Sequence, residues 1–95
     1  MEKRDLYLQK INAQIDEYSA KLKVMRSKAT VVHVDMKLEY LNQVEKLEEK
    51  RDGLKRKYKE ISKASESSWE DIKEGTESAW NDLKESLDKA IKHFK

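Results

Sequence analysis

The sequence predicts an all-α protein in which a long helix folds back on a shorter one. Its 95 residues include no proline and only two glycines, whereas β folds need such turn residues at regular intervals. The chain is 42% charged and 37% apolar, a balance that is also typical of disordered proteins. Its apolar residues, however, recur at helical spacing, and this regularity favours a long helix or coiled coil.

The long helix is expected over residues 3–63, which carry one apolar seam. The steps between seam residues alternate between three and four, as in a heptad repeat, then become three consecutive fours through Met36, Tyr40 and Val44. The heptad resumes as far as Ile61, with Arg51 in one seam position. The first part of the seam consists of Leu8, Ile11, Ile15, Tyr18, Leu22, Met25, Ala29 and Val32.

A turn is expected at residues 64–67, within "KASESSWE". Clustered serines disfavour a helix interior, and Ser67 with Glu70 has the spacing of a capping box. Residues 1–65 carry a net charge of +5 and residues 66–95 a net charge of −3, which also fits a chain that folds back on itself. The fold should bring the acidic Glu70, Asp71, Glu74 and Glu77 close to Lys55, Arg56, Lys59 and Lys63.

The return helix, expected over residues 68–94, contains an eleven-residue repeat. "SWEDIKEGTES" and "AWNDLKESLDK" align, so that Trp69, Trp80 and Ile91 recur at the same position. Eleven residues fill about three helical turns, so this stripe runs nearly straight along the helix. Small residues including Gly75 and Ala79 line its edge. They either allow another helix to approach closely, which we expect, or are merely tolerated at the edge of a core.

The apolar arc of the return helix is too wide for a two-stranded coiled coil. We therefore expect a homo-oligomer, a dimer or a tetramer, with four or more helices in cross-section. The expected assembly interface consists of Trp69, Ile72, Gly75, Ala79, Trp80, Leu83, Leu87, Ile91 and Phe94.

Two other architectures remain open. A break within "TVVHV", residues 30–34, would give a three-helix up-down-up bundle, because β-branched residues form helix poorly. The segment contains no turn residue, so this alternative ranks second, and one unbroken rod ranks third. The dipeptide Asp52–Gly53 is typical of turns, but the apolar seam continues across it.

The pattern W-x-x-I-K-x-G-x-x-x-A-W-x-x-L, from Trp69 to Leu83, resembles the closing motif of a family of small bacterial and cyanobacterial coiled-coil proteins. The similarity extends over most of the chain, including "KLEYLNQVEKLEEKRD", and departs from the family at "TVVHVD". Members are commonly described as stress-response proteins. The resemblance implies a helical fold and an association with stress, and it implies no catalytic residues.

Catalysis and metal binding are not expected. The histidines, His33 and His93, are sixty residues apart, and neither belongs to an E-x-x-H pair of the kind that binds iron in helical bundles. Cysteine is absent, and no glycine-rich phosphate loop is present. We therefore expect no enzyme and no cofactor. Nothing in the sequence directs the chain out of the cytoplasm.

The favoured function is that of a non-enzymatic structural or interaction protein, which associates through the tryptophan-containing helix. The alternative is a membrane-surface protein, in which Trp69, Trp80 and Phe94 meet the lipid interface. Nucleic-acid binding ranks third. Its basis is the basic run Lys50, Arg51, Lys55, Arg56, Lys57, Lys59 and Lys63, which carboxylates interrupt.

Overall fold

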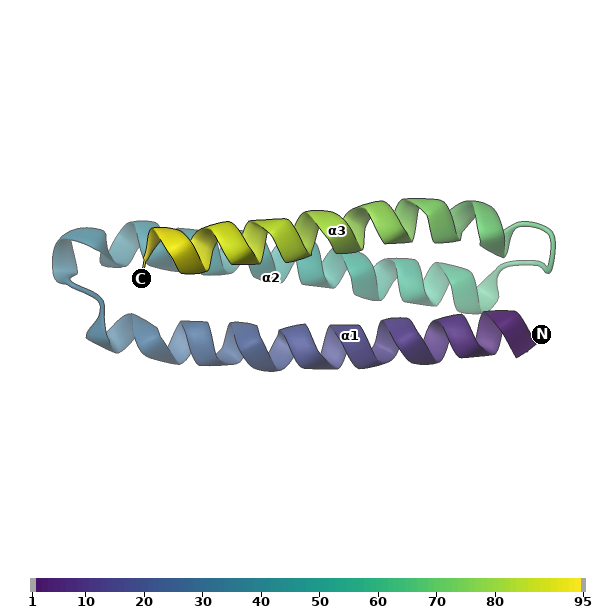
Figure 1. Cartoon of the computed structure of the whole chain (residues 1–95), viewed down its shortest axis with the longest axis horizontal. Helices are drawn as coiled ribbons and strands as arrows, with labels where there is room; N and C mark the ends of the chain where they lie inside the picture. The colour runs from purple at the N-terminus through teal and green to yellow at the C-terminus, as the bar shows by residue number, and fades with distance from the viewer. Residues whose placement is uncertain (1, 95) are drawn as a thin grey trace.

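The computed structural model describes residues 2–94, which form a three-helix bundle (Figure 1). Helix α1 spans Glu2–Ser27, a short 3-10 helix η1 spans Lys28–Val31, α2 spans Val34–Lys63 and α3 spans Trp69–His93. Helix α2 runs antiparallel to the other two, so α1 and α3 are parallel (Figure 1). The molecule measures 51 × 18 × 17 Å, close to the length of one 30-residue helix.

The all-α prediction is confirmed, but the single helix expected over residues 3–63 is wrong. The α-helix ends at Ser27, tightens into the 3-10 helix of Lys28–Val31 and is interrupted at Val32 and His33, whose ψ angles are 137° and 140°. Thr30, Val31 and Val32 are β-branched and have low helix propensity, so interrupting the α-helix at this stretch costs the protein little free energy. The break reverses the chain, so that α1 packs along the other two helices and its apolar seam is buried. The structure therefore corresponds to the second-ranked architecture.

His33 starts α2 by capping its first turn. Its Nδ1 atom accepts a hydrogen bond from the backbone N–H of Asp35, 3.2 Å away. The first N–H groups of a helix lack intrahelical partners, so a side-chain acceptor here satisfies one of them. Asp35 adds a negative charge in the first turn, where the helix dipole favours it. Histidine is not among the preferred capping residues, which is why the sequence did not reveal this helix start.

The second connection runs from Ala64 to Ser68 and is the turn expected from the serine cluster. The capping-box prediction is wrong, because the helix starts one residue later, with Ser68 at the cap and no side-chain capping bond. The hydroxyl groups of Ser65, Ser67 and Ser68 instead bond to one another. From α1, Arg4 donates a 2.8 Å hydrogen bond to the Ala64 carbonyl oxygen and so ties the turn to the bundle.

Burial in α3 follows a seven-residue period. Trp69, Thr76, Leu83 and Ala90 are spaced by seven and are all buried, whereas Ile91, on the eleven-residue stripe, is exposed. Thr76 is completely buried, and its hydroxyl donates a 2.8 Å hydrogen bond to the Ile72 carbonyl oxygen. A period of seven keeps one side of a helix against left-handed supercoiled neighbours. The eleven-residue repeat therefore describes only part of the core face of α3, and it fails at Ile91.

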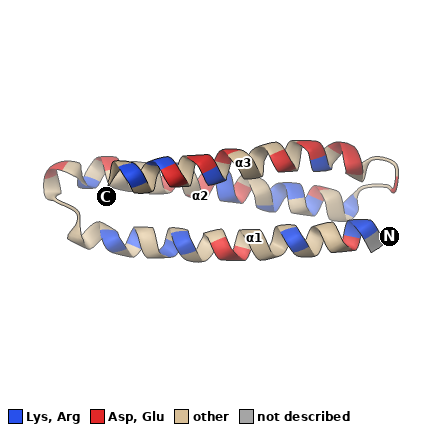
Figure 2. Cartoon of the chain, in the orientation of Figure 1, with Lys and Arg blue, Asp and Glu red and all other residues tan. Residues whose placement is uncertain are grey.

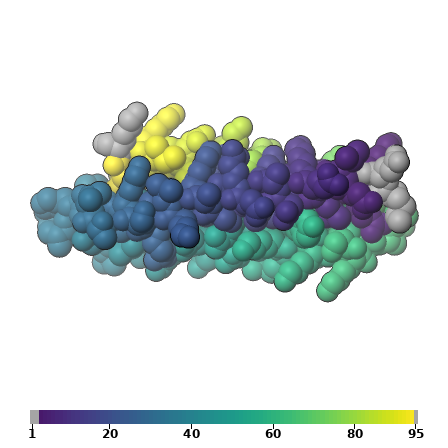
Figure 3. All heavy atoms as spheres, turned by 90° about the horizontal axis from the view of Figure 1, so that it is seen from below, coloured from purple at the N-terminus to yellow at the C-terminus, as the bar shows by residue number. Residues whose placement is uncertain are grey.

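The seams of α1 and α2 are close to the predicted ones. Along α2 the buried positions are Tyr40, Val44, Leu47, Leu54 and Ile61. Along α1 they are Tyr7, Ile11, Ile15, Tyr18, Leu22 and Met25, continued by Ala29 in η1. The predicted seam began at Leu8, which is only partly buried, and omitted Tyr7. Seen from the side of α1, the other helices emerge on either side of it (Figure 3), as a three-cornered bundle requires.

Gly75 does not mark a close approach of two helices within the chain. The residue is exposed, and a Cβ atom built on it would meet only the end of the Lys57 side chain, at 3.8 Å. A flexible lysine can move aside easily. The expectation of close packing at this glycine is therefore wrong for the helices of this chain.

We predict that Gly75→Ala stabilises the protein. Alanine is favoured over glycine in a helix interior by up to about 1 kcal/mol, and here the added methyl group meets no obstacle. Urea denaturation monitored by circular dichroism measures the change. A destabilised variant would contradict the prediction and indicate that another helix, from this chain or a second one, packs closely on position 75.

Candidate interaction surface

The residues predicted as an assembly interface are mostly occupied within the chain itself. Trp69, Leu83 and Leu87 are buried by α1 and α2. Ile72, Ala79, Trp80 and Phe94 are partly buried against the same core. Only Gly75 and Ile91 are exposed, so a second chain has little of the predicted apolar stripe left to contact.

Both tryptophans face tyrosines of α1. The ring centroids of Tyr7 and Trp69 are 6.1 Å apart, and those of Tyr18 and Trp80 are 4.5 Å apart in an edge-to-face arrangement. The two tyrosines, like the two tryptophans, are separated by eleven residues. Parallel helices advance by the same rise per residue, so equal spacing repeats the same contact about 16 Å further along. The shared eleven-residue spacing therefore places each tryptophan of α3 opposite a tyrosine of α1.

Large rings are needed here because α1 and α3 are the most widely separated pair of helices. The backbone of α2 lies close to both of the others along its length, whereas those of α1 and α3 scarcely approach each other. Tyr7 also donates a 2.9 Å hydrogen bond to Glu77 in α3, and burial together with this bond raises the pKa of Tyr7. Lys10 adds a 3.7 Å ion pair with the same carboxylate.

The tyrosine–tryptophan contacts stop before the end of the bundle. Eleven residues beyond Tyr18 and Trp80 lie Ala29 and Ile91, which have no aromatic ring. A pocket of about 290 Å³ opens near this level, lined by Met25, Lys28, Tyr40, Ala90, Ile91 and Phe94. A second hollow of about 350 Å³ lies next to it, between the α1–α2 connection and the end of α3.

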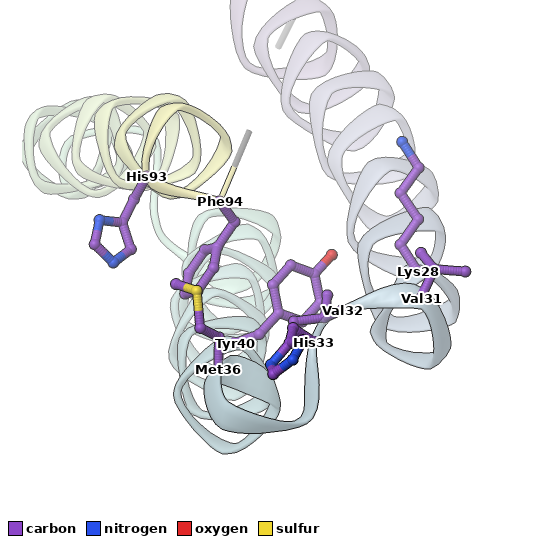
Figure 4. A pocket seen from close by; sticks show the side chains of 8 residues that line it. All are labelled: Lys28, Val31, Val32, His33, Met36, Tyr40, His93 and Phe94. Carbon is purple, nitrogen blue, oxygen red and sulfur yellow. The ribbon is translucent and has the colours of Figure 1, made fainter.

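Tyr40 and Phe94 line both of these pockets. Their rings meet edge to face at 5.0 Å, and Figure 4 shows them with Met36 between the ends of α2 and α3. The Tyr40 hydroxyl donates a hydrogen bond to the Met25 carbonyl oxygen near the end of α1, and burial raises the pKa of Tyr40. This contact fixes the position of the α1–α2 connection.

Most of the large exposed apolar side chains lie at this end of the molecule. Val31, Val34 and Leu38 are 81%, 75% and 73% exposed, and Met36 and Ile91 are exposed to a lesser degree. We call these five residues the apolar end. The sequence offered one signal for them: Val31, Val34 and Leu38 fall outside the heptad seam, in the stretch where its spacing is irregular. Val34 and Leu38 lie on the opposite side of α2 from Met36, so the five residues share one end of the bundle rather than one continuous face. Single exposed apolar residues are ordinary, but several at one end of a molecule are a candidate interaction surface.

An ion pair between Arg26, in the last turn of α1, and Glu48 joins α1 to α2 near the apolar end. Arg26 donates two hydrogen bonds to Glu48, at 3.0 and 2.6 Å, in a bidentate arrangement. These bonds hold the pKa of the Glu48 carboxyl below its usual value. They therefore contribute stability above the pKa of an unfolded glutamate, and this contribution is lost as the pH falls through the lower, folded value.

The charges along α2 and α3 are arranged differently from expectation (Figure 2). Among the described residues, no ion pair joins the acidic first turns of α3 to Lys55, Arg56, Lys59 or Lys63. The α2–α3 ion pairs found there are Lys50–Asp82 and His93–Glu39. Lys55, Arg56, Lys59 and Lys63 instead remain exposed, and the end of the Lys57 side chain lies near Gly75.

Both histidines lie at the same end of the bundle and line the same hollow. His93 Nε2 is 3.1 Å from Glu39, and His33 Nδ1 is 3.5 Å from Asp35. Within residues 2–94, no three histidine or carboxylate side chains gather closely enough to hold a metal ion. No helix in that range is long and apolar enough to cross a lipid bilayer.

No protein-family model matches the sequence, and neither a curated protein nor a solved structure matches it.

We predict that Trp80 and Tyr18 are energetically coupled. Trp80→Ala should destabilise the fold by about 3 kcal/mol, because removing a large ring that packs against the core leaves a gap there. Tyr18→Ala should cost less in the Trp80→Ala background than alone, by about 0.5–1.5 kcal/mol, the usual strength of an aromatic pair. A double-mutant cycle from urea denaturation measures this difference. Strictly additive effects would show that the two rings do not meet.

The Arg26–Glu48 pair predicts a pH-dependent effect of Glu48→Gln. The substitution should lower the melting temperature at pH 7 and have a smaller effect at pH 3, below the pKa of an unfolded glutamate, because the contribution of the pair is lost as the pH falls through the lowered folded pKa of Glu48. Thermal unfolding at both pH values measures the effect, with the exposed Glu49→Gln as the control. An equal loss at both pH values would mean that the glutamine disturbs packing rather than the ion pair.

Proposed function

We propose that this chain is a non-enzymatic helical interaction protein that docks on its partner through the apolar end. The observation that carries the proposal is that five of the seven large exposed apolar side chains among the described residues, Val31, Val34, Met36, Leu38 and Ile91, lie at one end of the bundle. Elsewhere on the described surface, the large exposed apolar residues are Leu6 and Val24.

Leaving these side chains in water is costly in a protein of this size. Burying apolar surface contributes about 25 cal/mol per Å², so each fully covered valine or leucine contributes on the order of 1.5–3 kcal/mol to an association. A chain of 95 residues has a small core, so it gains little by exposing apolar residues without a use for them. A docking role accounts for their exposure.

The proposal retains the interaction role expected from the sequence and moves it to a different surface. Association through the tryptophan-containing helix could use only Ile91, Gly75 and the uncovered edges of neighbouring side chains. The resemblance to coiled-coil stress-response proteins implies a helical fold and an association with stress. It does not identify the partner.

Site-specific photo-crosslinking in the native cells tests the proposal. A benzoylphenylalanine at position 38 should form an adduct, whereas the same residue at position 6 should form little or none. Leu6 is a suitable control because it is also exposed, at 64%, and lies at the opposite end of α1. The mass of the adduct separates three occupants: a second copy of the chain, another protein, or a lipid.

Equal crosslinking at positions 38 and 6, or none at either, would contradict the proposal. Because both positions are exposed in the folded protein, the substitutions themselves should leave its circular dichroism unchanged.

A further inference from the structure

We infer that the apolar end docks on the surface of an anionic lipid bilayer. This inference rests on the proposed function, since it names the partner of the same surface. It differs from the membrane mode expected from the sequence, in which the tryptophans met the lipid: here Trp69 is buried and the contact is made by the α1–α2 connection.

The most exposed apolar residues are Val31, Val34 and Leu38. Val31 lies in η1, and Val34 and Leu38 follow at intervals of three and four residues, so that the two α2 residues lie one turn apart on the same side of the helix. The connection that carries Val31 protrudes at the end of the bundle (Figure 1). Exposed aliphatic side chains suit a fluid interface, which closes around them, whereas a folded partner would need a matching cavity.

Lysines occur at the same end of the bundle, Lys28 and Lys37 in and after the α1–α2 connection and Lys89 and Lys92 near the end of α3. Apart from Arg26, which is paired with Glu48, residues 24–41 and 88–94 contain four lysines against three carboxylates, a net charge of +1. Among the described ion pairs, none includes Lys28, Lys37, Lys89 or Lys92. Two of the three carboxylates, Asp35 and Glu39, instead face the imidazoles of His33 and His93. The lysines are therefore available to phosphate groups.

The positive charge distinguishes between a lipid surface and a second copy of the chain. Two copies that met end to end about a twofold axis would bring the same cations together, and like charges repel. An anionic bilayer has the complementary charge and attracts each nearby lysine. The combination of inserted aliphatic side chains and lysines at the same end is the one that peripheral membrane proteins use.

Vesicle co-sedimentation tests the inference on the full-length chain. We expect binding to vesicles of equal parts phosphatidylglycerol and phosphatidylcholine, and at least tenfold weaker binding to phosphatidylcholine alone. Raising the salt concentration from 50 to 500 mM should weaken the first interaction. Equal binding to the two kinds of vesicle, or binding to neither, would overturn the inference.

Matched variants localise the contact. Leu38→Asp should weaken binding to anionic vesicles about tenfold or more, whereas Leu6→Asp, the same change at an equally accessible site, should not weaken it. Lys28→Gln and Lys92→Gln should each weaken binding about fivefold, as expected for one lysine near an anionic surface. An effect of Leu6→Asp as large as that of Leu38→Asp would overturn the assignment to the apolar end. Circular dichroism confirms that each variant is folded.

The two proposals can fail separately. If the chain ignores anionic vesicles but crosslinks at position 38 to a second copy or to another protein, the lipid inference is wrong and the docking function stands. If position 38 crosslinks no more than position 6 and vesicles are not bound, both are wrong.

Discussion

The parallel alignment of α1 and α3 is the constraint on which the rest of the structure depends. It follows from the break at Lys28–His33, which reverses the chain once more than a hairpin would. Two parallel helices with aromatic residues at equal spacing meet ring against ring at successive levels, and here Tyr7 meets Trp69 and Tyr18 meets Trp80. These contacts fill the widest seam of the bundle and give the tryptophans a role inside a single chain.

The pockets at one end of the bundle follow from the same parallel alignment of α1 and α3. Where the next aromatic pair would stand, the chain has Ala29 and Ile91, and the seam opens into pockets lined by Tyr40 and Phe94. The hydrogen bond from Tyr40 to the Met25 carbonyl and the Arg26–Glu48 pair hold the connection in place despite its β-branched residues. The proposed docking surface therefore sits on a firmly attached turn, so its exposed valines project from a defined structure.

The helical class, the α2 seam and the turn near Ser65 could be predicted, because each depends on local spacing or on residues with a strong local preference. The break before α2 could not be ranked first, because its residues are weak helix formers without a turn residue, and tertiary packing decides between the two conformations. The partners of the tryptophans were hidden for a related reason. Tyr7 lies beside the heptad seam that marked Leu8, and only the three-dimensional arrangement brings it to Trp69.

The residues of the apolar end were likewise difficult to predict from the sequence. Val34 and Leu38 fall outside the heptad seam, but in a stretch where the seam spacing is irregular this signal is too weak to establish from sequence alone that they are exposed. Gly75 is the converse case. Its place in a line of small residues suggested close packing, while in the structure it faces a lysine at the surface. Both outcomes depend on which side of the helix the neighbouring helices occupy.

The reversal of the chain at Lys28–His33 is the central claim, and a distance between α1 and α2 tests it most directly. Nitroxide labels at Asn12 and Lys59, measured by pulsed electron resonance in a sample diluted with unlabelled protein, report that distance within one chain. The three-helix bundle predicts a short separation, set by helix axes about 10 Å apart and by the reach of the labels. A continuous helix would place the labels about 70 Å apart, and a distance of that size would contradict the account.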